Sequence, residues 1–410
     1  MDIAEPESVG FSSARLDTVE QAWKTEIANK SFPGAVTLIA RKGKVIYHRA
    51  VGHMDAAQTT PMRLDAVFNI ASLTKPVVSV ATLMLLEKGR IKLSDPIGVH
   101  LKEFAKATLK TEVVSCDKVG NLRSELISAD RPVTVQDLMR HTSGFAYSER
   151  QAGPLLRKAY IDGNIEARVA PSSAEDMLRN LAEAPLADHP GMVFRYSIST
   201  DVLGLLLERV LDKPLDAILR EMVLSPLGMN DTGFAMPPKN RQPEFFAEEP
   251  GREAHLRNIA LNGHDGTSYF KGGSGLMSTV MDYFRFTSML FNNGRLDGVR
   301  LLSPKTVELM TSDHLEGMER QAYAGVAPMV GPGYGFGLGV AVRITKGVSY
   351  SPGSIGDYTW GGSRGHIFTT DPAEQLTGIF MSYGAVARLH TRQVFKNLIY
   401  GAVEATETTA

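Results

Sequence analysis

Two short runs rich in β-branched and other apolar residues lie near the N-terminus, Val36–Ala40 and Val45–Ala50. The four residues between them, Arg41-Lys42-Gly43-Lys44, are polar and include a glycine. Apolar runs of this length around a polar, glycine-containing turn are typical of a β-hairpin. We therefore expect the chain to begin its ordered core with two antiparallel strands.

From Ser72 to about Leu290 the apolar residues follow helical spacing. Residues 199–229 predict two helices divided near Lys213-Pro214, since proline cannot continue a helix interior. Residues 281–294 carry an apolar stripe that stops at Asn293-Gly294, a typical C-terminal signal. The pair Ser303-Pro304 resembles an N-cap followed by proline in the first turn of a further helix.

After Gly331 the pattern predicts strands again, at 334–343, 365–371 and 375–384, followed by a helix with apolar residues at Val394, Phe395, Leu398 and Ile399. Strands at both ends and helices between them predict an α/β protein with an antiparallel sheet flanked by terminal helices and an inserted, mostly helical domain. We place the sheet domain at 1–70 and 291–410 and the helical domain at 71–290, with the active site between them. The proline-rich, charged residues 236–258 predict a long surface loop.

Composition narrows the class of protein. The 410 residues are 43% hydrophobic and 22% charged, with a formal net charge of -1, so nucleic acid and anionic membranes are not expected partners. Cys116 is the single cysteine, which excludes an internal disulfide. The first ten residues lack the pattern of a secretory signal, and no apolar run has the length of a membrane span. We expect a cytoplasmic protein without metal or other cofactor, and monomer and homo-oligomer both stay open.

Ser72 and Lys75 lie at the start of a very apolar helical segment. Residues three apart lie on one face of an α-helix and eclipse in a 3₁₀ turn, so the two side chains can meet in either form. A serine hydroxyl needs a base beside it to act as a nucleophile, and a buried lysine can be that base. Ser72 and Thr74 are also possible helix caps, with Pro76 in the first turn, and Lys75 could be a surface residue.

The spacing S-x-x-K is common by chance, and it occurs again at Ser115–Lys118. That second copy lies among Asp117, Gly120 and Asn121 with no apolar helix after it. Its composition predicts a solvated loop. The first copy therefore needs support from other motifs.

That support comes from four segments that follow in order: HTSGFAY at 141–147, FRYSISTDVLG at 194–204, KGGSGLMSTVMDY at 271–283 and YTWGGSRGHIFTTDPAEQL at 358–376. With the Ser72 segment, these motifs resemble the serine β-lactamase and penicillin-binding protein superfamily. Within it, the chain is most similar to the family VIII carboxylesterases, which share the class C β-lactamase fold. The resemblance extends from about Phe32 to the C-terminal helix.

The resemblance implies a role for each matched position. Ser72 would be the acylated nucleophile, Lys75 its activating partner, and Tyr196 the phenol that shuttles protons with the lysine. The backbone N–H groups of Ser72 and Ser363 would form the oxyanion hole. The remaining matched residues would contact the substrate: Tyr147, Ile198, Trp360, Gly361 and Gly362. Taken singly, Tyr196 and Trp360 also fit packing roles, and His141 fits a structural histidine in a turn.

Two departures from the family pattern bear on the substrate. Ile198 stands where β-lactamases commonly have asparagine, and Trp360 stands where they have the lysine of K-T-G. The site thus lacks an amide that would hydrogen-bond the substrate and the lysine, and a cation that would hold a β-lactam or peptide carboxylate. The resemblance therefore implies a short-chain carboxylic ester, a small neutral molecule, as substrate.

Other functions stay open on the sequence alone. A β-lactamase, a D-amino-acid peptidase or an acyltransferase would use the same acyl-enzyme, and a non-catalytic scaffold protein would keep the fold without the chemistry. Residues 361–365 also match the nucleophile elbow G-x-S-x-G around Ser363, with Asp371 and His390 following in order. An elbow needs a helix directly after the serine, whereas the residues after Ser363 predict a strand.

Overall fold

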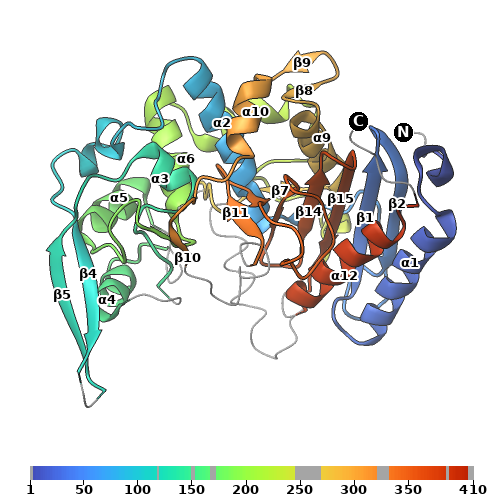
Figure 1. The fold of residues 1–410 in the computed structure, drawn as a ribbon, viewed down its shortest axis with the longest axis horizontal. Helices are drawn as coiled ribbons and strands as arrows, with labels where there is room; N and C mark the ends of the chain where they lie inside the picture. The colour runs from blue at the N-terminus through green and yellow to red at the C-terminus, as the bar shows by residue number, and fades with distance from the viewer. Residues whose placement is uncertain are drawn as a thin grey trace.

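The computed structural model describes residues 3–117, 120–148, 153–166, 172–244, 269–320, 332–384 and 387–404. Figure 1 shows a sheet at one side of the molecule and a mostly helical region at the other. The sheet has seven strands in the order β11-β12-β13-β14-β15-β1-β2, and every neighbouring pair is antiparallel. This architecture confirms the predicted α/β fold with an antiparallel sheet.

Both ends of the chain supply strands to this sheet. Its strands are β1 (Gly34–Arg41), β2 (Lys44–Gly52), β11 (Tyr334–Phe336), β12 (Ala341–Arg343), β13 (Tyr358–Gly361), β14 (Ile367–Asp371) and β15 (Leu376–Ser382). The N-terminal hairpin is confirmed. The single strand predicted for 334–343 is wrong, because Gly337 N–H donates to Val340 O and turns the chain back between β11 and β12.

Helices cover both faces of the sheet. The terminal helices α1 (Ser13–Ala28) and α12 (Arg388–Gly401) lie side by side on one face. There Trp23 and Phe395 pack with Phe380 in a separate apolar cluster. Helix α9 (Val280–Phe291) packs against β1 and β15 on the other face. Because helices cover both faces, the central strands β1 and β15 are buried at every position.

The helical region contains α2 (Thr74–Glu87), α3 (Val135–Met139), α4 (Pro154–Asp162), α5 (Ala174–Glu183), α6 (Ser199–Leu211) and α7 (Leu215–Leu219). The break between α6 and α7 confirms the division predicted at Lys213-Pro214. Helix α10 (Pro304–Met310) is also confirmed, and Ser303 Oγ accepts a hydrogen bond from Thr306 N–H as its N-cap. The predicted boundaries of the two domains remain predictions; α9, placed by sequence in the helical part, packs on the sheet.

The sequence predicted loops at Ser115–Lys118 and at residues 236–258. The strands β4 (Lys110–Cys116) and β5 (Leu122–Ser128) pair as a hairpin, and Ser115 belongs to β4. The predicted solvated loop is thus wrong at Ser115, which is in a strand. The residue is nevertheless exposed. A hairpin that projects into solvent can carry polar side chains, so its composition resembles that of a loop. Lys118 and residues 245–258 of the predicted surface loop lie outside the described residues.

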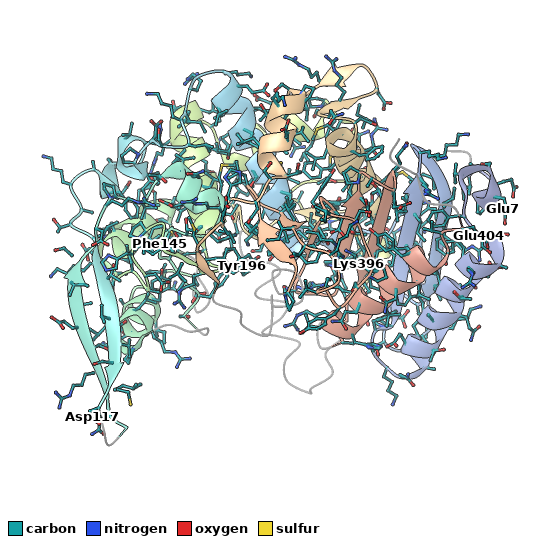
Figure 2. All side chains as sticks on the ribbon, viewed as in Figure 1. Glu7, Asp117, Phe145, Tyr196, Lys396 and Glu404 are labelled. Atoms are coloured by element: carbon teal, nitrogen blue, oxygen red, sulfur yellow. The ribbon has the colours of Figure 1, made fainter. Side chains whose placement is uncertain are left out.

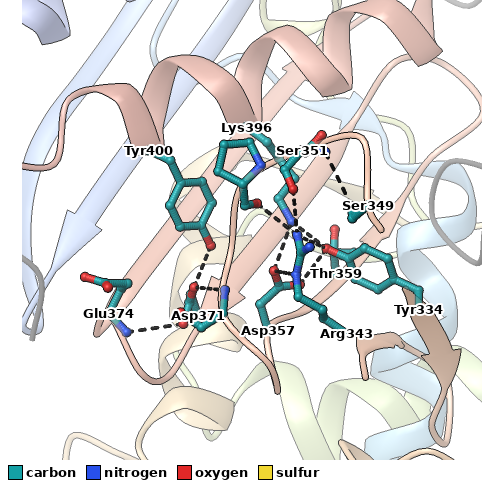
Figure 3. Close-up of polar contacts among 12 residues, drawn as sticks. Tyr334, Arg343, Ser349, Ser351, Asp357, Thr359, Asp371, Glu374, Lys396 and Tyr400 are labelled. Atoms are coloured by element: carbon teal, nitrogen blue, oxygen red, sulfur yellow. Dashed lines mark hydrogen bonds and ion pairs between the residues drawn. The ribbon is translucent and has the colours of Figure 1, made fainter. Parts of the chain in front are cut away.

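A buried polar network fixes α12 to the sheet (Figure 3). Asp357, before β13, pairs with Arg343 of β12 at 2.7 Å and with Lys396 of α12 at 3.3 Å. Lys396 Nζ also donates to Tyr334 Oη at 2.8 Å. Burial lowers the pKa of Lys396, while the Asp357 carboxylate opposes that shift. The network therefore supplies partners for the charges that α12 brings into the interior.

Candidate active site

The segment that carries Ser72 runs from β3 (Phe68–Asn69) through a 3₁₀ turn, Ala71–Leu73, into α2. Ser72 and Thr74 do not cap this helix, because the N-cap position is Leu73 and no side chain bonds to the free N–H groups there. The predicted caps are therefore wrong, whereas Pro76 does lie in the first turn. Ser72 is partly exposed. Ser72 lies in the 3₁₀ turn and Lys75 three residues later in α2, a spacing that favours one common side for the two side chains.

The backbone around Ser72 is tightly held. Ala71 has a φ of 47°, a left-handed conformation that costs a non-glycine residue about 1 kcal/mol or more. Three hydrogen bonds from distant parts of the chain hold the segment in place: Ile70 N–H to Leu276 O at 3.0 Å, Tyr283 Oη to Leu73 O at 3.0 Å and Asn69 N–H to Tyr383 Oη at 2.6 Å. Surrounding elements thus impose the strained conformation next to the serine.

Lys75 is buried, with 1% of its surface exposed. Its Nζ donates to the carbonyl oxygen of Gly273 at 2.7 Å and lies 3.5 Å from Tyr147 Oη, the outer limit of a hydrogen bond. The same Nζ lies 4.9 Å from the centroid of the Tyr196 ring, within cation–π distance. The surface alternative for Lys75 is therefore excluded, and the lysine lies between the two tyrosines.

Tyr196 lies between β6 (Val193–Phe194) and α6, where Figure 2 shows it between the helical region and the sheet. Its ring contacts His141 at 4.7 Å, Trp360 at 5.3 Å and Tyr147 at 5.8 Å between centroids. Trp360 has no exposed surface, and its ring packs edge-on against the Tyr196 ring. Ile198, also buried, ends this segment as the N-cap of α6.

The turn after β13 contains Gly362 and Gly365, and we call it the glycine turn; it lies against the segment that carries Ser72. A Cβ on Gly362 would come within 2.5 Å of Ile70 O and 2.7 Å of His366 Cδ2, so only glycine fits there. The next residue, Ser363, is exposed. The N–H of Ser363 thus belongs to a turn in close contact with the backbone two residues before Ser72.

His366 joins this turn to the Ser72 segment. Its Nε2 lies 2.8 Å from Asn69 O, Ser382 N–H donates to its Nδ1 at 3.3 Å, and its carbonyl accepts from Gly362 N–H at 3.0 Å. These partners assign the proton of the neutral ring to Nε2. The pKa of His366 is lowered to about 3, mainly by burial. The nearby cations of Arg364 and Arg392 act in the same direction, and the hydrogen bond to Asn69 O opposes the shift. The neutral imidazole is therefore a fixed structural link.

Arg392 of α12 holds the other side of the turn. Its Nη2 donates to Gly362 O and its Nε donates to His366 O at 3.1 Å. Burial lowers the pKa of Arg392 to about 9. The polar network of Figure 3 fixes the same helix, so the position of the glycine turn depends on how α12 docks.

Sequence reasoning missed three contributors near Lys75 and the turn: Gly273, Asp201 and His366. Gly273 N–H donates to Asp201 Oδ1 at 3.1 Å, while its carbonyl accepts from Lys75. An aspartate in the first turn of an otherwise apolar helix was a usable signal for Asp201, and the GGSG string was one for Gly273.

His141 is buried with a φ of 57°, and burial and the charge of Lys75 hold its pKa well below the ordinary value. A neutral structural histidine agrees with the turn role considered for it.

The nucleophile elbow at Ser363 is excluded by its context. Ser363 follows β13 and precedes β14, so no helix comes after it. Asp371 accepts from Tyr400 Oη at 2.7 Å, and His390 pairs with Glu26 at 2.9 Å, so neither belongs to a triad with Ser363.

Across the described ranges, no group of three or more His, Cys, Asp or Glu residues is placed to hold a metal ion. None of the described helices is both long and apolar enough to cross a membrane.

An antiparallel sheet, a mostly helical region, and a serine and a lysine three residues apart at the start of α2 define the serine β-lactamase-like fold. The chain belongs to the beta-lactamase family, whose model matches residues 17–393. Protein Rv1367c of Mycobacterium tuberculosis is 35% identical, with 85% of each chain covered. Esterase EstB of Burkholderia gladioli is 32% identical, with 90% of each chain covered. The solved structure of EstCE1, a hydrolase with promiscuous acyltransferase activity, is 27% identical, with a TM-score of 0.76, and covers 96% of this chain and 98% of its own.

Proposed function

We propose that this protein is a carboxylesterase of the family VIII type, which cleaves short-chain carboxylic esters through an acyl-enzyme on Ser72. The observation that carries the proposal is the convergence of Lys75, Tyr196 and the glycine turn before Ser363 on the start of α2. The esterase relative, EstB, supports an ester as the substrate class.

In the proposed reaction, Ser72 Oγ attacks the ester carbonyl carbon and its proton passes to the Lys75–Tyr196 pair. The backbone N–H groups of Ser72 and Ser363 bind the oxyanion of the tetrahedral intermediate. The carbon–oxygen bond to the alcohol then breaks, and the alcohol oxygen takes the proton from the pair. Water repeats the sequence on the acyl-enzyme, which releases the acid and restores Ser72.

The residues around this pair favour a neutral substrate. Ile198 supplies no amide to hydrogen-bond a substrate, Trp360 supplies no cation to hold a ligand carboxylate, and both side chains are buried. Tyr147 is half-buried beside Lys75, so its ring is available to a bound acyl group. We assign Gly361 and Gly362 the close approach of the sheet edge to the substrate.

Acyl transfer to an alcohol is a second candidate, favoured by the likeness to EstCE1. An alcohol would replace water in the second half of the reaction, with the same residues in the same roles. Hydrolysis and transfer therefore differ only in which hydroxyl reaches the acyl-enzyme first.

The decisive experiment locates the acyl group and separates the two serines. After a brief pulse of p-nitrophenyl butyrate, mass spectrometry of a proteolytic digest should find butyryl on the peptide with Ser72. Ser72→Ala should abolish hydrolysis, whereas Ser363→Ala should keep most of it because the oxyanion hole uses the backbone N–H. A folded, active Ser72→Ala variant would overturn the proposal. A butyrate ester formed when an alcohol is added identifies the transferase reaction.

A further inference from the structure

The β4–β5 hairpin projects from the helical region, with Asp117 at its far end (Figures 1 and 2). The outer edge of β4 is occupied near its base. There Glu112 N–H donates to Leu186 O at 2.8 Å, and Leu186 N–H donates to Lys110 O at 2.7 Å. No strand in the described part of the chain pairs with the outer edge of β5.

The hydrogen-bond pattern shows which groups of β5 face this open edge. Asp117 N–H donates to Asn121 O and Ala129 N–H donates to Leu109 O, so odd-numbered residues form the hydrogen-bonded pairs of the hairpin. The N–H and C=O groups of the even-numbered residues Leu122, Ser124 and Leu126 therefore point away from β4. They form a short row of donors and acceptors available to another strand.

The face of the hairpin that carries the even-numbered residues of β5 exposes three large apolar side chains. Leu122 is 64% exposed and Leu126 is 41% exposed. Val114, which pairs with Ser124 and so lies on the same face as the two leucines, is 43% exposed. On the opposite face, Arg123 and Glu125 are exposed and have no ion-pair partner among the described residues. The segment 122–126 thus reads Leu, Arg, Ser, Glu, Leu, with opposite charges placed symmetrically about Ser124.

We propose that β5 pairs antiparallel with β5 of a second copy of this chain, with the two-fold axis at Ser124. Antiparallel pairing about Ser124 places Leu122 opposite Leu126 of the partner subunit and Arg123 opposite Glu125 of the partner subunit. The outward-facing backbone groups of the even-numbered residues become the hydrogen-bonded pairs. The segment is therefore complementary to itself in backbone, apolar contact and charge.

Neighbouring registers lack this complementarity. An axis at Arg123 places two arginines opposite each other, and an axis at Glu125 does the same with two glutamates, which is destabilising. The pairing about Ser124 joins two marginal two-stranded hairpins into one four-stranded sheet, in which the exposed leucines of the two copies contact each other. Such a contact buries well under about 1,200 Å², so we expect a weak dimer with a dissociation constant in the micromolar range.

Charge reversal tests the proposal directly. Sedimentation velocity over a series of micromolar concentrations should show the wild type shifting from monomer to dimer. Arg123→Glu and Glu125→Arg each place like charges opposite, so each variant should be monomeric at every concentration. The double variant restores opposite charges and should dimerise again. A wild type that stays monomeric, or a dimer insensitive to both single changes, would overturn the proposal.

Cross-linking tests the register. In a Cys116→Ser background, Ser124→Cys places two thiols in a hydrogen-bonded pair whose Cα atoms lie about 5.5 Å apart, within disulfide range. Mild oxidation should yield a covalent dimer. Ser128→Cys is the matched control on the same strand; its two copies lie about 27 Å apart in this register and should not cross-link. Cross-linking at 128 but not at 124 would contradict the register. Circular dichroism and hydrolysis of p-nitrophenyl butyrate report whether each variant is folded.

Discussion

Lys75 Nζ donates a 2.7 Å hydrogen bond to the carbonyl oxygen of Gly273, and the N–H of that same glycine donates to Asp201. Gly273 therefore lies between the ammonium of α2 and the carboxylate of α6. A Cβ on Gly273 would lie 2.5 Å from Asp201 Oδ2 and 3.1 Å from Lys75 Nζ. This close approach fixes where the lysine can place its charge.

Gly273→Ala should therefore impair catalysis more than folding. The added methyl must displace Lys75 or Asp201, so we expect kcat for p-nitrophenyl butyrate to fall about tenfold or more, as small misplacements of catalytic groups do. Gly233→Ala is the matched control, because a Cβ there meets no atom within 4 Å. Steady-state kinetics and thermal melts of both variants make the comparison. Unchanged kcat in a folded Gly273→Ala protein would contradict the positioning role.

Lys75 and Tyr196 should act as one proton-transfer unit. Removing either group breaks the same step, so Lys75→Ala and Tyr196→Phe should each lower kcat about a hundredfold or more. The double variant should lose much less than the product of the two single losses. A double-variant cycle on kcat gives the answer. Losses that multiply would mean that the two groups work independently.

His366 should make stability fall in acid. Its folded-state pKa of about 3 lies below the ordinary value of 6.5, so between these pH values the unfolded chain binds a proton that the folded chain excludes. Its contribution is fully present above pH 6.5 and is lost as pH falls, at about 1.4 kcal/mol per pH unit. His141, whose pKa is also lowered, acts in the same direction.

His366→Gln isolates this contribution, because glutamine can still donate to Asn69 O but does not titrate. Urea unfolding at pH 7 and pH 5 should show a smaller loss of stability for the variant, by about 2 kcal/mol. Carboxylates that titrate in this range affect both proteins alike. Equal losses in wild type and variant would show that His366 is already protonated in the folded protein.

Substrate class follows from Ile198 and Trp360. The leaving group of an ester departs as an alkoxide or phenoxide and needs less acid assistance than that of an amide, and neither Ile198 nor Trp360 offers a cation to a ligand carboxylate. We expect kcat/KM for short p-nitrophenyl esters to exceed that for any penicillin by a wide margin. Trp360→Lys alone should not create a good β-lactamase, since Ile198 still supplies no hydrogen bond. Penicillin hydrolysis that matches the best ester would contradict this expectation.

Local patterns predicted much of the fold. The hairpin of β1 and β2, the break at Lys213-Pro214 and the Ser303 cap all depend on neighbouring residues, so the sequence could indicate them. The β4–β5 hairpin was missed because its residues are mixed in polarity and it projects from the core. The turn between β11 and β12 was missed because glycines in an apolar run resemble a continuous strand.

Sequence patterns likewise predicted some residues of the candidate site and missed others. The spacing of Ser72 and Lys75 and the ordered motifs around Tyr196 and Trp360 indicated residues that the fold brings together. Gly273 and His366 contribute through contacts between segments far apart in the sequence. The GGSG string marks Gly273, but no local pattern shows which segments these residues contact. The left-handed backbone conformation of Ala71 could not be predicted from the sequence either, because the surrounding elements impose it.

The pairing of β1 with β15 has a consequence for how the protein is made. Strand β1 is synthesised early, but its neighbour β15 is complete only at Ser382. The helix α12, which packs beside α1 on the sheet, is complete only at Gly401. On the ribosome, the glycine turn, His366 and Arg392 reach the Ser72 segment only when translation is nearly over. We therefore expect the nascent chain to stay without esterase activity until its last helix emerges, so that premature termination anywhere before that helix yields an inactive product.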